Sequence, residues 1–337
     1  MSAKELLIRA DAGPRIGTGH VMRMLALAEA WVSRGGRFVL TGALPPPLAQ
    51  RVEHTGGQWI PRPLDVDDGA WTRMLAVTRG AAAVVADGYS FGPEFQEQVV
   101  STGRPLMVVD DNGENREYRA QLVLNLNVHA DEAMYRTRRP GSQLLLGPTF
   151  ALIRREILAS VPRSRAVAGP VSECLVTLGG ADPLDLTGSL LRVSPGCFRW
   201  RVLVGAANPR LEAYQRLRRD DLTLVANTPF FAREALRCQL AFAAAGGTVW
   251  ELALLNVPSA VVSVAANQEA LAARLAELGA VDLLGDARLG VHVTEWVGRL
   301  EALANDPPRR QRLIDSARGI VDGRGAERVV SRLLEVV

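Results

Sequence analysis

The sequence predicts an α/β protein made of two Rossmann-like domains, each with its own parallel sheet. Short apolar runs alternate with helix-like segments along the chain, and this alternation is typical of parallel sheets covered by helices. The 337 residues are about twice an ordinary domain. A Pro, Ser, Arg, Ala and Gly stretch at 159–170 interrupts the pattern once, which indicates a connection between domains. We therefore expect an N-terminal domain at 1–158 and a C-terminal domain at 171–325.

The elements of the first domain follow from its apolar runs. A helix is predicted at 20–34, because Val21, Leu25, Ala28 and Val32 recur at three- and four-residue steps. The proline-rich stretch 44–48 is interpreted as a turn. The predicted strands are 6–10, 37–41, 82–87, 106–110, 122–125 and 144–146.

The same plan then restarts in the second domain. Three late segments, 295–304, 309–317 and 327–337, have helical patterns. The last helix, 326–337, could pack against the first domain or remain with the second. The predicted strands are 174–178, 200–204, 222–225, 240–243, 260–264 and 281–284.

Composition excludes several classes. The chain has 39 Lys and Arg against 36 Asp and Glu, without a long basic run, so nucleic acid binding is not indicated. Cys174, Cys197 and Cys238 are widely spaced in apolar surroundings, so neither a disulfide framework nor a metal cluster is expected, and a reducing cytoplasm fits. No apolar stretch reaches membrane-spanning length, and the N-terminus lacks the order of a signal peptide.

The first candidate site lies in the loop after the first strand. Gly17 and Gly19 allow positive φ and close backbone approach, and His20 follows them at a helix start. We interpret His20 as a base that faces a crevice; the alternative is a histidine that caps or packs the helix. Met22 breaks the dinucleotide fingerprint. Asp11 is read equally as a turn or cap residue and as a contact to a sugar hydroxyl or a catalytic partner.

Two further strands end in polar residues that should emerge at the same sheet edge. Asp87 and Tyr89 follow one strand, and Asp110 and Asp111 follow the next. Adjacent aspartates point apart along a strand and no third ligand accompanies them, so a metal site is not expected. Turn hydrogen bonding is the main alternative to substrate binding.

The second domain offers two glycine-containing loops. Gly180 and Asp182 open its first strand-to-helix turn; backbone N–H groups there could approach a phosphate or a sugar, although such turns are also ordinary architecture.

The later loop is the stronger candidate. Gly246, Gly247 and Thr248 can form an anion-binding helix start for a diphosphate. Glu251 is placed to accept ribose hydroxyls or simply to stabilise the first helical turn. Asn267 and Gln268, at a second helix start, offer amide groups.

Taken together, these motifs resemble the UDP-sugar hydrolases of pseudaminic acid biosynthesis, which act on UDP-2,4-diacetamido-2,4,6-trideoxy-β-L-altropyranose. Phe150 stands where a tyrosine is common in that family. The matching segments cover nearly the whole chain and are Arg9-Ala10-Asp11, Gly17-Thr18-Gly19-His20, Asp87-Gly88-Tyr89, Val109-Asp110-Asp111, Leu124-Asn125-Leu126-Asn127, 146–154, 179–183 and 265–268.

The resemblance implies a glycosyltransferase B-type fold with a nucleotide-sugar crevice between the two domains. It implies that UDP sits on the second domain, that His20 faces the anomeric carbon, and that water replaces an acceptor without an obligatory metal or other cofactor. The alternatives are a glycosyltransferase and a noncatalytic nucleotide-sugar binding protein. The candidate catalytic residues are His20, Asp11 and Tyr89, and the candidate substrate-binding residues are Gly17, Gly19, Arg23, Asp110, Asp111, Arg154, Gly180, Asp182, Gly246, Gly247, Thr248, Glu251, Asn267 and Gln268.

Overall fold

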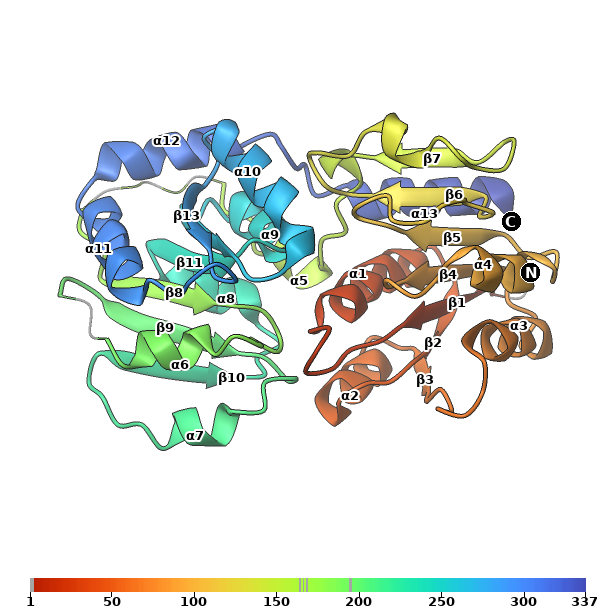
Figure 1. Ribbon diagram of the computed structural model, residues 1–337, viewed down its shortest axis with the longest axis horizontal. Coiled ribbons are helices and arrows are strands. Elements are labelled where there is room, and N and C mark those ends of the chain that lie inside the picture. The colour runs from red at the N-terminus through yellow and green to blue at the C-terminus, as the bar shows by residue number, and fades with distance from the viewer. Residues whose placement is uncertain (1–2, 164, 166, 168, 194–195) are drawn as a thin grey trace. The chain divides into compact units, whose positions relative to one another are not determined.

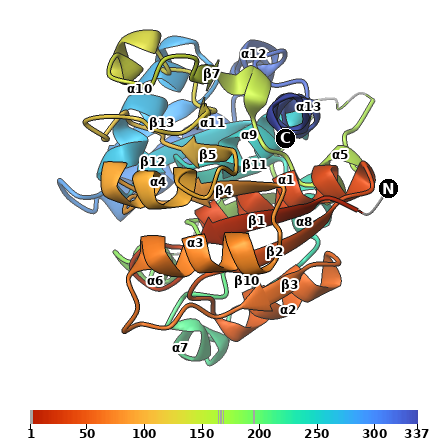
Figure 2. The ribbon, with the colours of Figure 1, turned by 90° about the vertical axis from the view of Figure 1, so that its right-hand side faces the viewer.

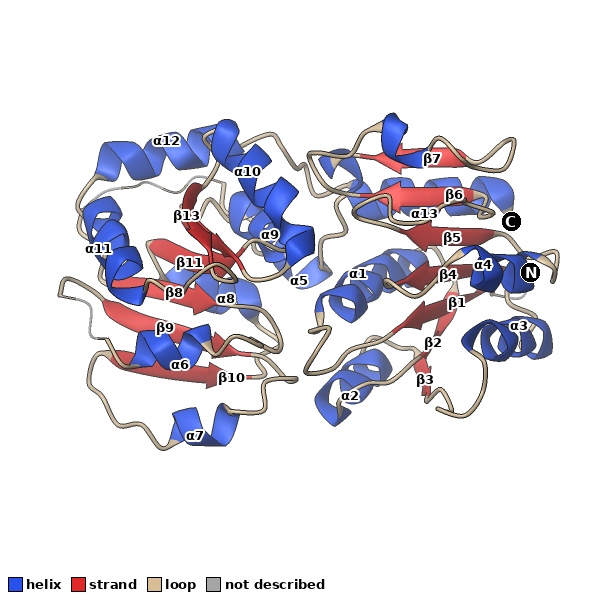
Figure 3. Ribbon diagram, viewed as in Figure 1, coloured by secondary structure: helices blue, strands red, loops and turns tan. Residues whose placement is uncertain are grey.

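The computed structural model describes residues 3–163, 165, 167, 169–193 and 196–337. The chain divides into two compact units, and each contains one parallel β-sheet with helices (Figures 1 and 3). The first unit consists of the chain up to Gly13, His20–Arg154 and Gly323–Val337, and the second of Pro14–Gly19 and Arg155–Asp322. The α/β class with two Rossmann-like sheets is therefore confirmed.

The first unit has a seven-stranded sheet in the order β3-β2-β1-β4-β5-β6-β7, and all of its strand pairs are parallel. Its strands are β1 (Glu5–Ala10), β2 (Arg37–Thr41), β3 (Gln58–Ile60), β4 (Ala83–Asp87), β5 (Leu106–Val109), β6 (Leu122–Asn125) and β7 (Gln143–Leu146). Its helices are α1 (Gly19–Ser33), α2 (Pro46–His54), α3 (Asp68–Thr78), α4 (Pro93–Val100), η1 (Glu132–Tyr135), η2 (Pro148–Phe150) and α13 (Gly325–Val336).

Helices cover both faces of this sheet. Figure 2 shows α3 and α4 on one face and α1, α2 and α13 on the other. The strands are nearly continuous apolar runs because helices cover both faces of the sheet. In β1, for example, every residue is buried. Helix α1 buries the predicted apolar stripe, including Val21, Leu25 and Ala28.

The second unit has a six-stranded sheet in the order β10-β9-β8-β11-β12-β13, again with parallel pairs. Its strands are β8 (Glu173–Thr177), β9 (Arg199–Val204), β10 (Leu222–Ala226), β11 (Leu240–Ala244), β12 (Ser259–Ser263) and β13 (Asp282–Asp286). Its helices are α5 (Arg155–Leu158), α6 (Leu186–Leu191), α7 (Leu211–Gln215), α8 (Phe231–Arg237), α9 (Thr248–Leu254), η3 (Ala266–Gln268), α10 (Glu269–Glu277), α11 (Val293–Ala304) and α12 (Pro307–Ala317).

Each predicted strand has a counterpart, and the differences lie in short or proline-rich segments. Strand β3 was not predicted, because it has three residues and no buried one. The stretch Pro45–Pro47 begins a helix, α2, where proline fits because the first helical N–H groups have no partner in any case. The predicted connection at 159–170 includes residues 164, 166 and 168, which lie outside the described residues.

In both sheets the strand order reverses once. In the first unit this switch point lies between β1 and β4, and in the second it lies between β8 and β11. Loops that leave the carboxyl ends of the two strands at such a point run in opposite directions and leave a crevice, where open α/β sheets bind ligands. The residues at these two switch points are therefore the first to be considered as sites.

Candidate functional site

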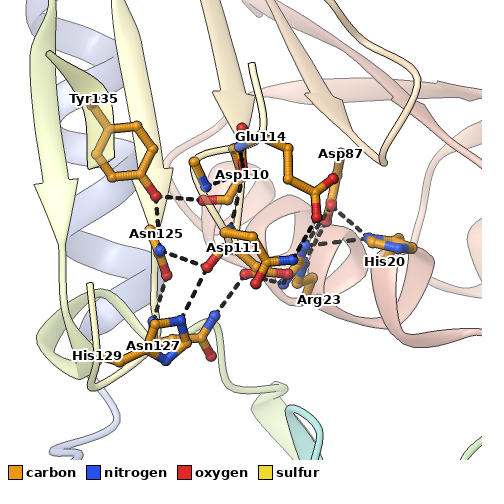
Figure 4. Close-up of polar contacts among 12 residues, drawn as sticks. His20, Arg23, Asp87, Asp110, Asp111, Glu114, Asn125, Asn127, His129 and Tyr135 are labelled. Atoms are coloured by element: carbon orange, nitrogen blue, oxygen red, sulfur yellow. Dashed lines mark hydrogen bonds and ion pairs between the residues drawn. The ribbon is translucent and has the colours of Figure 1, made fainter. Parts of the chain in front are cut away.

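In the first unit, the switch point brings together His20 and Asp87. Asp87 is the last residue of β4 and pairs in register with Ala10 at the end of β1. His20 is the second residue of α1, which follows the loop after β1. His20 Nδ1 lies 2.7 Å from Asp87 Oδ1, and both side chains are buried (Figure 4).

This geometry assigns the tautomer of His20. A carboxylate only accepts hydrogen bonds, so Nδ1 carries the proton and donates it to Asp87. The other ring nitrogen, Nε2, is then left with a lone pair, and no hydrogen bond to the described residues reaches it. A histidine held in this way by an aspartate has the arrangement of a general base.

Asp87 is also held by Arg23, which lies one turn further along α1. Arg23 Nε donates to Asp87 Oδ2 and Arg23 Nη2 to Asp87 Oδ1, both at 2.6 Å. Burial alone would raise the pKa of Asp87, but the charges and hydrogen bonds of Arg23 and His20 lower that pKa to about 2. Asp87 is therefore a carboxylate at any ordinary pH.

The far side of Arg23 is held by Asp111, which follows β5. Arg23 Nη1 lies 3.0 and 2.9 Å from the two carboxylate oxygens of Asp111. The side chain of Asn127 donates from Nδ2 to Asp111 Oδ1 at 2.9 Å, and the backbone N–H of Asn127 donates to Asn125 Oδ1. Figure 4 shows the resulting chain of side chains from His20 to Asn127. Every side-chain member of it except Arg23 is buried.

Tyr89 lies beside His20 at the exposed end of this chain. The two rings meet edge to face, with centroids 4.8 Å apart, and 52% of Tyr89 is exposed. Partial burial of Tyr89, and then the negative charge of Asp111, raise the pKa of Tyr89 to about 12. Its phenol is therefore a neutral hydrogen-bond donor at neutral pH.

Asp11 does not contact His20 and belongs to a separate cluster. Arg9, from β1, donates from Nη2 to Asp11 Oδ2 at 2.7 Å, and through Nε and Nη2 to both oxygens of Asp68 at 2.6 Å. The Ala43 amide donates to Asp11 Oδ1. Burial would raise the pKa of Asp11, but these contacts to Arg9 and Ala43 lower it. The Asp11 carboxylate is thus held by Arg9 and by the loop that follows β2.

Asp110 is likewise occupied by its own loop. Its Oδ1 accepts from the amides of Asn112 and Gly113, and its Oδ2 accepts from Tyr118 and from the Asn115 side chain. These are the hydrogen bonds of a tight turn. The structure thus separates Asp110 from Asp111, although the two are neighbours in sequence.

In the second unit, the loops after β8 and β11 flank the switch point. Asp182 is buried, has a φ of 45°, and accepts from the amides of Leu186 and Thr187 at the start of α6. Gly180 lies so close to Gly205 that a Cβ on Gly205 would come within 2.4 Å of the Gly180 Cα. This loop is closely packed, and its aspartate supports the helix.

The loop after β11 is more open. Helix α9 begins at Thr248 after Gly246 and Gly247, and a Cβ on Gly247 would meet no atom within 4 Å. Glu251 is buried in the first turn of α9. Gln268, at the end of η3, accepts from the Val264 amide through Oε1, and Asn267 precedes it.

The remaining candidates are more dispersed. Gly17 has a φ of 75°, whereas Gly19 is the first residue of α1. Arg154 is half-buried and directly precedes α5. In the described part of the chain, no three His, Cys, Asp or Glu side chains are grouped so as to hold a metal ion. No helix in the same part is long and apolar enough to cross a membrane.

Sequence reasoning missed the importance of Asp87 and Asn127 as partners. The sequence placed Asp87 at the sheet edge but did not predict its pairing with His20, and Asn127 was named only through the resemblance. For Asn127 the available signal was that it lies just beyond a buried strand, since polar residues at strand ends share one sheet edge. The sequence alone does not show that β4 pairs with β1, and this pairing brings Asp87 close to His20.

No family model matches the chain. Three curated proteins are similar over most of their length. The spore coat polysaccharide biosynthesis protein SpsG of Bacillus subtilis is 23% identical, covering 98% of this chain and 97% of the relative. The UDP-2,4-diacetamido-2,4,6-trideoxy-β-L-altropyranose hydrolase of Campylobacter jejuni is 21% identical, covering 82% and 97%. The UDP-N-acetylglucosamine–N-acetylmuramyl-(pentapeptide) pyrophosphoryl-undecaprenol N-acetylglucosamine transferase of Phenylobacterium zucineum is 26% identical, covering 92% and 93%.

Solved structures agree on the fold. MnaA of S. aureus, solved with UDP, has a TM-score of 0.67 at 12% identity and covers 99% of this chain and 98% of its own. MurG of Acinetobacter baumannii has a TM-score of 0.61 at 17% identity and covers 98% and 99%. The chain has the glycosyltransferase B-type fold. This confirms the fold that the resemblance implied, and the fold alone does not fix the reaction.

Proposed function

We propose that this protein is an enzyme that acts on a nucleotide sugar and hydrolyses the anomeric C–O bond of a UDP-linked amino or deoxy sugar. The products are UDP and the free sugar. The observation that carries this proposal is the buried His20–Asp87 pair at the switch point of the first sheet, with His20 Nε2 left as an acceptor. Such a pair suits the activation of water.

Two of the relatives support the substrate class. The Campylobacter jejuni protein is named as a hydrolase of a UDP-linked diacetamido sugar, and the Phenylobacterium zucineum protein as a transferase of N-acetylglucosamine from its UDP derivative. Both names contain a UDP-linked amino sugar. Proteins with one fold can bind the same class of substrate and still transfer the sugar to different acceptors.

The proposed step is a displacement at the anomeric carbon. His20 Nε2 accepts a proton from water as the water oxygen bonds to C1, and the C1–O bond to the diphosphate breaks with its electron pair leaving on UDP. Asp87 stabilises the imidazolium that forms on His20. We propose that Tyr89, as a neutral phenol beside the His20 ring, donates a hydrogen bond to the sugar.

The second unit is proposed to hold the nucleotide. Backbone N–H groups at the start of α9, after Gly246 and Gly247, together with the Thr248 hydroxyl, would bind the diphosphate. Glu251 would accept the ribose hydroxyls, and Asn267 and Gln268 would supply amide donors. These backbone and amide groups would stabilise charge on the departing UDP.

A glycosyltransferase is the second candidate. It is favoured by the similarity to the N-acetylglucosamine transferase, which at 26% exceeds the 21% to the hydrolase. In that case the same base would deprotonate an acceptor hydroxyl instead of water. A noncatalytic nucleotide-sugar binder would keep the α9 loop and have no need of the His20–Asp87 pair.

Acceptor-free release of UDP separates these candidates. A panel of UDP-sugars that includes the diacetamido-trideoxy-altrose compound is incubated with the wild type, His20→Ala and His54→Ala. His54 is the matched control, because it is an exposed histidine on α2. We expect the wild type and His54→Ala to release UDP, and His20→Ala to lose at least about a hundredfold in rate. UDP binding without release would overturn the hydrolase and direct the search to acceptors.

A further inference from the structure

We propose that Asp111 is a positioning residue that selects the tautomer of His20 by holding the guanidinium of Arg23. This inference rests on the proposed function of His20 as a base. It gives Asp111 a role that requires no contact with substrate. The juxtaposition that carries it is the position of Arg23 Nη2, which lies near both Asp87 Oδ1 and His20 Nδ1.

Arg23 Nη2 lies 2.6 Å from Asp87 Oδ1 and 3.2 Å from His20 Nδ1. The two contacts support opposite tautomers. If Nδ1 carries the proton, it donates to Asp87, and Nη2 also donates to Asp87. If Nδ1 has a lone pair, Nη2 can donate to it instead, and the proton moves to Nε2, where it blocks the basic position.

Together with Asp87, the direction in which Arg23 Nη2 points therefore determines which tautomer of His20 is favoured. Its direction is set from the far side, where Nη1 meets both oxygens of Asp111 at 3.0 and 2.9 Å. Nε is fixed on Asp87 Oδ2 at 2.6 Å. With both ends of a planar fork held, Nη2 remains directed at Asp87.

Asp111 is itself held by the last residue of β6 and by the segment that follows it. Its Oδ1 accepts from Asn127 Nδ2 at 2.9 Å, and its backbone oxygen accepts from Asn125 Nδ2 at 2.9 Å. Asp111, Asn125 and Asn127 are all buried. The carboxylate is thus occupied by Arg23 and Asn127, an arrangement suited to orienting another side chain.

The chain contains a matched control for this arrangement. Arg9 is also held between two carboxylates, those of Asp11 and Asp68, near the end of β1. That bridge has the same charges as the one formed by Asp87, Arg23 and Asp111, but it contacts no histidine in the described residues. Asp68→Asn therefore removes one carboxylate from a similar bridge without acting on His20.

The test reads the tautomer directly. Protein labelled with ¹⁵N-histidine has four imidazoles, and the spectrum of His20→Gln assigns the signal of His20. Two-bond ¹H–¹⁵N correlations are recorded at about pH 8, above the ordinary imidazole pKa. We expect the Nδ1–H form in the wild type and in Asp68→Asn, and a substantial Nε2–H population in Asp111→Asn. UDP release by Asp111→Asn should lose about tenfold or more in kcat with little change in KM.

A His20 tautomer in Asp111→Asn that matches the wild type would overturn the proposal, whatever the activity. If Asp111→Asn does not fold, Asn127→Ala decides in its place: it keeps both charges and removes the amide that orients Asp111. A gain of the Nε2–H form in Asn127→Ala supports the proposal, and an unchanged spectrum refutes it. If the tautomer shifts but the wild type releases no UDP, the proposed reaction fails while the positioning of His20 by Asp111 stands.

Discussion

Asp87→Asn removes a buried carboxylate that should stabilise the first unit only while it is charged. Its pKa is lowered from 3.8 to about 2 in the folded protein. Since each unit of difference is worth about 1.4 kcal/mol, ionised Asp87 contributes about 2 kcal/mol to the free energy of unfolding at neutral pH. Because the folded pKa is the lower one, this contribution is complete above the unfolded pKa and is lost as pH falls from about 4 to 2.

Urea unfolding of the wild type, Asp87→Asn and the exposed control Asp65→Asn, at several pH values between about 2.5 and 7, measures this contribution. The asparagine amide facing Arg23 adds a cost that does not depend on pH. Between pH 7 and pH 2.5 the stability difference between the wild type and Asp87→Asn should therefore shrink by about 1.5 kcal/mol, and by more than the difference for the exposed control Asp65→Asn. A difference for Asp87→Asn that is the same at all pH values would mean that the charge of Asp87 does not stabilise the first unit.

The same variant should also be inactive for a separate reason. An asparagine can donate to His20 Nδ1, which favours the Nε2–H tautomer. We expect kcat for UDP release to fall by about 10³- to 10⁴-fold, the size of loss that the wrong tautomer causes in a Ser-His-Asp triad. A loss of less than about tenfold would mean that Asp87 does not orient a catalytic base.

Three further predictions concern the rest of the chain. The pKa of all four tyrosines is raised above the ordinary value of 10, chiefly by burial and, for most of the four, also by nearby carboxylates. An ultraviolet titration should therefore show no tyrosinate at pH 10, and ionisation of even one tyrosine at that pH would contradict these environments. In Gly205→Ala the new Cβ would come within 2.4 Å of the Gly180 Cα, so this variant should lose about 1–3 kcal/mol of stability. Gly247 has open space around it, so the stability of Gly247→Ala should stay within about 0.5 kcal/mol of the wild type. Equal melting temperatures of the two variants would contradict the close packing of Gly205 against Gly180. Arg310 is buried and donates to the backbone oxygens of Leu303, Ala304 and Gly169, so Arg310→Met should cost about 2–4 kcal/mol in urea unfolding, against little change for the exposed Arg312→Met; similar values for the two would contradict this role.

The strands were predictable because parallel strands covered on both faces leave apolar runs that stand out in the sequence. Strand β3 was not, because Gln58, Trp59 and Ile60 are few and none is buried. Its place at the sheet edge depends on pairing with β2, which is a tertiary contact.

The candidate site was predictable only in part. His20 could be singled out because a glycine-containing loop places it at a helix start beyond a strand end. Its pairing with Asp87 required the order of strands in the sheet, which the chain order does not give. Asp110 and Asp111 have the same chemistry and adjacent positions, yet one closes a turn and the other holds Arg23. Rotamer and loop geometry separate them, and neither leaves a trace in residue identity.

In the proposed reaction, water attacks the anomeric carbon and His20 takes the proton of that water. The most direct measurement is UDP-sugar turnover in H₂¹⁸O without an acceptor, with mass analysis of both products. We expect one ¹⁸O in the released sugar, none in UDP, and loss of turnover in His20→Ala. Label in a phosphate product would place the cleavage at phosphorus, and labelled sugar formed at the wild-type rate by His20→Ala would contradict the role of His20.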